Sequence, residues 1–278
     1  MRNDDNYYSY NDYGSDTLYL LEQPASRPVG DAVVWLKHLL VLLGGKLPQW
    51  VLTTVLMFIS IMVMVIGLGL MLDALGFEAA LKQKEAWVFV VMIVGVLFIN
   101  MLPLFFMAGF VSIVAGVAEE GKFAFGRLFA GFGDPMLQLI KLFLFWLLVS
   151  FALGLLAGIA GIKGGWLVLL VVLLFLLCNW MALPLIVLQG VSPLDAIWMS
   201  LVGSLKNILP QGGFVLAMLA MLLGTSYLVL DGFRLAVQHS GSWFLPLALL
   251  IFYTVLCAVF PIISYVSYRN IWTGAPLE

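Results

Sequence analysis

The chain has 278 residues, of which 63% are hydrophobic and 10% are charged, and its mean hydropathy is +1.10. Soluble domains are about 45–50% apolar and about 25% charged, so a water-soluble fold could not bury this chain. The net charge of −2 and the absence of a basic run exclude nucleic acid as a partner. With only two cysteines and two widely separated histidines, the sequence predicts no disulfide framework, metal site or cofactor.

The first 28 residues differ from the rest of the chain. They are polar, and they contain several tyrosines and acidic residues. Such a segment cannot bury enough apolar surface to fold alone, so we expect a solvated, disordered tail over residues 1–28. Residues 29–273 then form one membrane domain.

Six charge-free runs are long enough to cross a hydrocarbon core, which takes about 20 residues of helix. They cover Leu47–Leu72, Ala86–Ala118, Leu142–Ala160, Trp166–Gln189, Gly213–Leu230 and Phe244–Tyr268. The runs are continuously apolar, which is typical of helices and not of membrane strands. The predicted fold is therefore an all-α polytopic membrane bundle of about six transmembrane helices.

Lysine and arginine counts in the flanks predict the orientation of these spans. With both termini inside, nine basic residues lie on the inner side and four on the outer side. The inner set is Arg2, Arg27, Lys37, Lys46, Lys122, Arg127, Lys141, Lys206 and Arg269, and the outer set is Lys82, Lys84, Lys163 and Arg234. This bias predicts that both termini are cytoplasmic.

Prolines recur in a pattern that indicates three helical hairpins. One proline precedes the first span of each unit (Pro48, Pro135, Pro210), at spacings of 87 and 75 residues. Another lies in the second span (Pro103, Pro184, Pro261), at spacings of 81 and 77 residues. The first set suits the start of a helix, and the second set bends one. The predicted units cover about 29–118, 119–190 and 191–273, although prolines are also common in membrane helices without any repeat.

Two asparagines precede the second-span prolines. Asn100 and Asn179 can satisfy the backbone groups that Pro103 and Pro184 leave unpaired, and the third unit has no such residue before Pro261. Packing between helices is the plainer interpretation of these polar side chains. The alternative is that they line a path for a neutral solute.

Each unit also contains a short amphipathic segment. These segments are Asp31–Leu43, Lys122–Phe132 and a helix that starts at Ser192-Pro193-Leu194-Asp195, with serine as N-cap and proline in the first turn. We expect all three to lie at the inner headgroup surface as interfacial helices. The more specific alternative is that these segments bind a protein partner or lipid. The residues that would make this contact are Trp35, Lys37, Phe125, Arg127, Ser192, Asp195 and Trp198.

Two stretches resemble a family of uncharacterised bacterial inner-membrane proteins similar to the YciC-like proteins. They are Leu183-Pro184-Leu185-Ile186-Val187 with the following Ser192-Pro193, and the ending Ser264–Trp272. The resemblance covers most of the chain after residue 29. It implies a multi-pass protein of the bacterial inner membrane with six spans, and it implies no activity.

No arrangement of residues points to catalysis. The spans lack a nucleophile beside a base, an HExxH pair, and intramembrane charges of the kind that coupled transporters use. Gly154 and Gly158 form a GxxxG pattern that fits either an internal contact or a homo-oligomer. The sequence thus favours a non-enzymatic scaffold or accessory protein that contacts lipids and a membrane or cytoplasmic partner. A small channel or transporter for neutral or lipid-like solutes is the alternative.

Overall fold

The computed structural model describes residues 19–83, 86–159, 165–216, 227, 252 and 258–273. Within these ranges every regular element is a helix, in the order α1 (Asp31–Gly44), α2 (Leu47–Ala74), α3 (Phe77–Lys82), α4 (Ala86–Glu120), the 3₁₀ helix η1 (Phe125–Phe132), α5 (Met136–Ile159), α6 (Gly165–Asn179), α7 (Ala182–Gln189) and α8 (Pro193–Lys206). Residues 208–216 and 258–268 are also helical, and a π-helix, η2 (Arg269–Thr273), ends the described chain.

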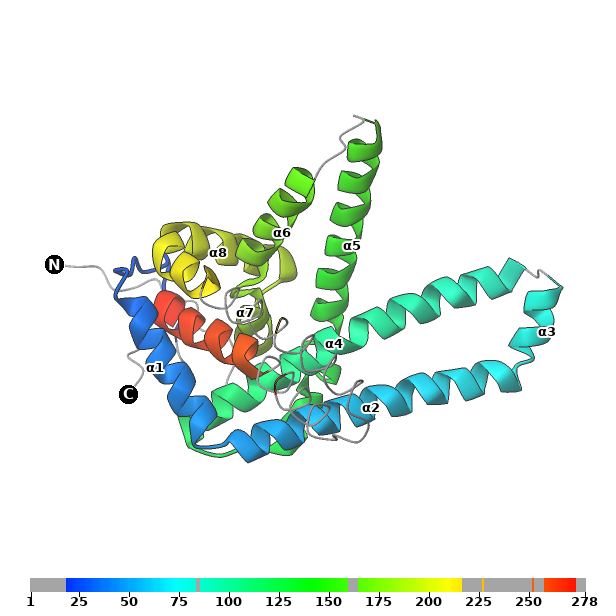
Figure 1. Cartoon of the computed structure of the whole chain (residues 1–278), viewed down its shortest axis with the longest axis horizontal. Helices are drawn as coiled ribbons and strands as arrows, with labels where there is room; N and C mark the ends of the chain where they lie inside the picture. Colours follow the sequence, from blue (N-terminus) through cyan, green and yellow to red (C-terminus); the bar gives the residue numbers. More distant parts are fainter. Residues whose placement is uncertain are drawn as a thin grey trace.

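Two helical arms leave a common centre (Figure 1). One arm is the antiparallel pair α2 and α4 with α3 at its tip, and the other is made of α5 and α6. Four segments in the described residues are long and apolar enough to cross a membrane: Leu47–Ala74, Ala86–Glu120, Met136–Ile159 and Val171–Gln189. The expected fifth and sixth spans lie mostly outside the described residues.

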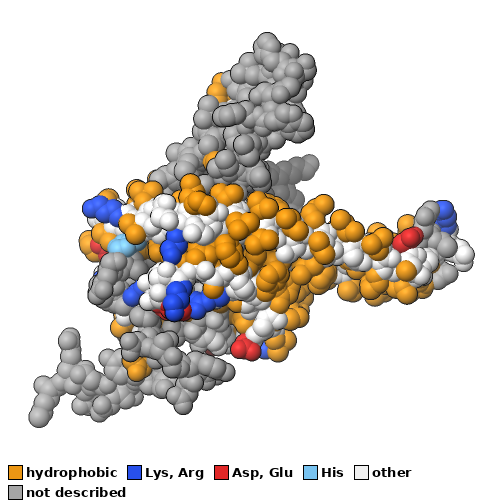
Figure 2. All heavy atoms as spheres, turned by 90° about the horizontal axis from the view of Figure 1, so that it is seen from below, with side chains coloured by type: hydrophobic (Ala, Val, Ile, Leu, Met, Phe, Trp, Pro, Cys, Tyr) orange, Lys and Arg blue, Asp and Glu red, His pale blue; other side chains and the backbone are white. Residues whose placement is uncertain are grey.

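Charges bound the α2–α4 arm at both ends. Asp73 and Lys82 lie near its tip, and Lys46 and Glu120 lie where α2 begins and α4 ends. Figure 2 shows hydrophobic side chains covering the arm between these two charged zones. In the most apolar 18-residue stretch of α2, only 6% of the residues are buried inside the molecule. The apolar side chains of this stretch therefore need a nonpolar environment outside the protein.

Prolines and glycines set the ends of these long helices. Pro48 occupies the first turn of α2, where its missing N–H removes no helical hydrogen bond. The helix α4 continues through Pro103 and ends before Gly121, which has a φ of +67°. The N–H of Lys122 then donates to the carbonyl of Gly116, which closes the helix end.

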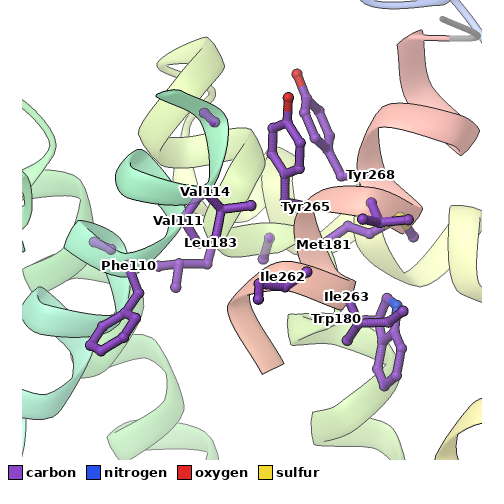
Figure 3. Close-up of a cluster of buried hydrophobic side chains, with 14 of the residues drawn as sticks. Phe110, Val111, Val114, Trp180, Met181, Leu183, Ile262, Ile263, Tyr265 and Tyr268 are labelled. Atoms are coloured by element: carbon purple, nitrogen blue, oxygen red, sulfur yellow. The ribbon is translucent and has the colours of Figure 1, made fainter. Parts of the chain in front are cut away.

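The C-terminal half of α4 forms the centre of the molecule. It packs with η1 and α7, and its residue Glu119 is hydrogen-bonded to Tyr265 of the C-terminal helix (residues 258–268). The helix α8 packs in turn on α6 and α7. We call the assembly of α4, η1, α7, α8 and the C-terminal helix the hub. Figure 3 shows Val111 and Val114 of α4 beside Leu183 of α7 and Ile262 of the C-terminal helix in one apolar cluster. Except for Leu183, which is 6% exposed, these side chains have no exposed surface.

Glycines allow η1 to press against α4 at backbone distance. A β-carbon at Gly109 would lie 1.9 Å from the carbonyl oxygen of Leu128, and one at Gly131 would lie 2.1 Å from that of Phe105. No residue other than glycine fits at either position without moving the backbone. The amphipathic segment expected at 122–132 is therefore a 3₁₀ helix fixed to α4, with Phe129 on its exposed side.

Candidate functional site

The helix break between α6 and α7 organises the polar groups of the hub. Pro184 has no N–H, so the carbonyl of Trp180, four residues earlier, cannot receive its helical hydrogen bond. The hydroxyl of Ser264 in the C-terminal helix donates to this carbonyl instead. The indole N–H of Trp180 donates to the hydroxyl of Ser267, at 2.9 Å. The C-terminal helix thus satisfies one side of the break.

The helix α8 satisfies the other side. Ser200 accepts a hydrogen bond from the N–H of Met181 at 2.9 Å and donates to the carbonyl of Leu177, also at 2.9 Å. Ser204 donates to the same carbonyl at 3.1 Å. Gly203 completes this face, because a β-carbon there would lie 2.8 Å from the methyl carbon of Met181. The small polar stripe of α8 therefore pairs the backbone groups that the helix break leaves free.

Two buried tyrosines connect the ends of three helices. Tyr265 donates to the Glu119 carboxylate at the end of α4, at 2.8 Å, and accepts a long hydrogen bond from Arg269, at 3.5 Å. Gln189 at the end of α7 donates to the hydroxyl of Tyr268, at 2.6 Å. Figure 3 shows the two rings side by side, with their hydroxyls directed away from the apolar cluster. The network ties α4, α7 and the C-terminal helix together.

Residues 19–28 form a strap over this end of the hub. The backbone N–H groups of Leu21 and Ala25 donate to carbonyls of η2, both at 2.8 Å. Asn207 accepts from the N–H of Arg27 at 2.7 Å and donates to the carbonyl of Ala25 at 2.9 Å. Arg27 also donates from its guanidinium to the carbonyl of Asn270. These ten residues, assigned from the sequence to the solvated tail, are held against the helices, whereas residues 1–18 lie outside the described residues.

The two asparagines expected beside the proline bends use their amides locally. Asn100 donates to the Val96 carbonyl at 2.7 Å, one turn back on α4, and so does not pair the carbonyl four residues before Pro103. Asn179 donates to the Phe175 carbonyl at 2.8 Å and accepts from the indole of Trp146 at 3.0 Å. The serines of α8 and the C-terminal helix, not Asn179, therefore serve the break before Pro184. Pro261 lies inside the C-terminal helix.

The residues expected at the surface divide into two groups. Trp35 is fully buried, so it packs α1 against the rest of the molecule and is not accessible to a partner. Trp198 is 65% exposed, and Lys37 and Phe125 are also exposed. Ser192 and Asp195 cap α8 as the sequence predicts, since the Ser192 hydroxyl accepts from the N–H of Asp195.

Arg127 and the GxxxG glycines have different surroundings. Arg127 forms an ion pair with Glu120, and its guanidinium lies over Gly116 and donates to the Ser112 carbonyl at 3.4 Å. A β-carbon at Gly154 or at Gly158 would have no described neighbour within 4 Å. An internal contact among the described residues does not use this glycine face.

The sequence did not reveal the tyrosine network or the strap. The available signal was the three-residue spacing of Tyr265 and Tyr268, which places both rings on one helical face beside Arg269.

Partial burial and, secondarily, the positive charge of Arg269 lower the pKa of His38 on α1 below its ordinary value of 6.5. The same end of the hub thus contains a histidine that its surroundings make harder to protonate.

Comparisons with protein-family models, with curated proteins and with solved structures found no match to this chain.

Proposed function

We propose that the chain is a non-enzymatic integral membrane protein that acts as a scaffold or accessory by binding lipids and a partner protein at one membrane face. The single observation that carries the proposal is the pairing of polar groups inside the hub. Ser200, Ser204 and Ser264 are hydrogen-bonded to backbone at a helix break. Tyr265 and Tyr268 are bonded to side chains of neighbouring helix ends. Groups used in this way hold helices together and are not presented to a substrate.

Three hairpins around the hub are part of the proposal. The helices that contain the second-span prolines, α4, α7 and 258–268, meet there. A surface segment accompanies each of them. The segment η1 presses on α4, and α8 supports the break before α7. Asp31 of α1 and Arg27 of the strap both contact Asn270 in η2, which continues the C-terminal helix. This arrangement supports three repeated units, six spans and both termini on one side.

The membrane and the family also belong to the proposal. We infer a multi-pass protein of the bacterial inner membrane, similar to the YciC-like proteins, with α1, η1 and α8 on the cytoplasmic side. Lys37, Lys46, Lys122 and Arg127 support this orientation, because basic residues are enriched on the cytoplasmic side of membrane proteins. A solute path has less support, since the amide of Asn179 is bonded to Trp146 and to its own helix.

Co-purification tests the proposal. The full-length chain is extracted in mild detergent, and co-eluting proteins and lipids are identified by mass spectrometry. We expect a defined protein companion that Trp198→Ala removes, because Trp198 is the largest exposed side chain of α8. Phe151→Ala is the matched control, since Phe151 is 71% exposed on α5, on an apolar arm. A chain that elutes alone, or a companion lost equally in both variants, would contradict the proposal.

A further inference from the structure

A basic corner lies where α2 begins and α4 ends. We define it by Lys46, Lys122 and Arg127. The Lys46 ammonium donates to the carbonyl of Gly121 at 2.7 Å, which joins the α1–α2 turn to the loop after α4. Arg127 is paired with Glu120 in the same loop region. Three cationic side chains and one paired carboxylate thus meet at one end of the apolar α2–α4 arm.

Two of the three cations are not held in an ion pair, although the hydrogen bond and charge of Arg127 and, secondarily, the charge of Lys122 lower the pKa of Glu120. Neither Lys46 nor Lys122 forms an ion pair with any described residue, and both side chains have exposed surface. An ammonium group has three donors, and Lys46 uses one of them on Gly121. The remaining donors of both lysines can therefore bind an anion.

Aromatic side chains border the corner on its apolar side. Phe123 packs edge-on against Trp50 at a ring distance of 4.9 Å and against Phe125 at 5.2 Å. Phe125 is 36% exposed and Leu47, the first residue of α2, is 37% exposed. Aromatic rings next to cations at the end of an apolar helix are typical of the headgroup level of a bilayer.

We propose that the basic corner binds the phosphate of an anionic phospholipid in the adjacent leaflet. Lys46 and Lys122 donate to the phosphate oxygens. The acyl chains of that lipid lie along the exposed apolar surface of α2, below Leu47. Arg127 holds the loop in place through Glu120 and the α4 backbone, and it does not contact the lipid. This inference rests on the proposed membrane location, and it adds a site and a headgroup class to the proposed lipid binding.

The test compares lipid enrichment between variants. The full-length chain is reconstituted in vesicles of phosphatidylcholine with a minor fraction of phosphatidylglycerol, extracted in mild detergent, and its retained lipids are quantified by mass spectrometry. A lysine near a membrane surface contributes a factor of about five toward anionic lipid. We expect the ratio of retained phosphatidylglycerol to phosphatidylcholine to fall about fivefold for Lys122→Gln and further for the double variant with Lys46→Gln.

Two controls keep the result interpretable. Lys82→Gln removes a lysine from the opposite end of the arm and should leave the ratio unchanged, whereas Lys46→Arg keeps the charge and should retain the enrichment. An unchanged ratio in the double variant, or an equal fall in Lys82→Gln, overturns the inference. In the co-purification experiment, the double variant could lose an acidic protein companion and keep its lipids. That result would also overturn the inference, because the basic corner would then be a protein-binding site. If the lipid ratio falls while the Trp198-dependent companion remains, the inference stands independently of the protein partner.

Discussion

Replacing Gly109 by alanine should detach η1 from α4. A β-carbon there would lie 1.9 Å from the Leu128 carbonyl oxygen, and the carbonyl carbon and α-carbon of Leu128 are also within 3 Å. Because the obstacle is backbone and not a flexible side chain, η1 must move by more than 1 Å to reach ordinary contact distance. We assign to this overpacking a loss of stability of about 3 kcal/mol. The higher helix propensity of alanine stabilises the helix by up to about 1 kcal/mol. The expected net loss of stability is therefore about 2 kcal/mol.

Gly95→Ala is the matched control on the same helix. Its β-carbon would meet only a methyl group of Leu68, at 3.8 Å, which is ordinary contact. Gly95→Ala should therefore leave the free energy of unfolding unchanged or raise it slightly. Both variants are unfolded in mixed detergent micelles and followed by tryptophan fluorescence, to which Trp50 contributes through its stack on Phe110. Equal midpoints for the two variants would refute the close packing of η1 on α4.

Three further predictions concern the polar groups of the hub. Ser200→Ala leaves the N–H of Met181 unpaired and should cost about 1–3 kcal/mol in the same unfolding assay, whereas Ser150→Ala on an exposed face of α5 should cost almost nothing. Asn207→Ala should release the strap, so limited proteolysis should cleave within residues 19–28 faster than in the wild type while α8 remains protected. His38 has a lowered pKa, so the unfolded chain binds its proton more tightly than the folded chain does. Stability should thus be full above about pH 6.5 and fall as the pH decreases toward the lowered pKa, and His38→Gln should remove this slope.

The long spans could be predicted because their signal lies within each segment. A charge-free run and a proline in the first turn placed the start of α2 at Leu47, as the structure has it. The capping pattern at Ser192 likewise gave the start of α8 at Pro193. Local rules were sufficient for these helices because composition and capping act within a few residues of chain.

The hub could not be predicted in the same way. From the sequence, a helix bend is predicted equally at Pro103 and at Pro184. The structure continues α4 through Pro103 and breaks the chain before Pro184. What distinguishes the two sites is the presence of partners from distant segments, Ser200 and Ser264, which pair the groups freed at the break. Contacts that join residues more than 80 positions apart, such as Ser264 with Trp180, leave no periodic signal in the sequence.

Cysteine labelling from the two sides of the membrane tests the central claim most directly. In a background in which Cys178 and Cys257 are replaced by alanine, single cysteines are placed at Glu22, Lys82 and Asp134. A membrane-impermeant reagent is then applied to sealed cells and to inverted vesicles. The account predicts that Lys82→Cys is labelled in sealed cells, and that Glu22→Cys and Asp134→Cys are labelled only in inverted vesicles. Labelling of all three positions from one side would contradict an α2–α4 pair that crosses the membrane from a cytoplasmic hub.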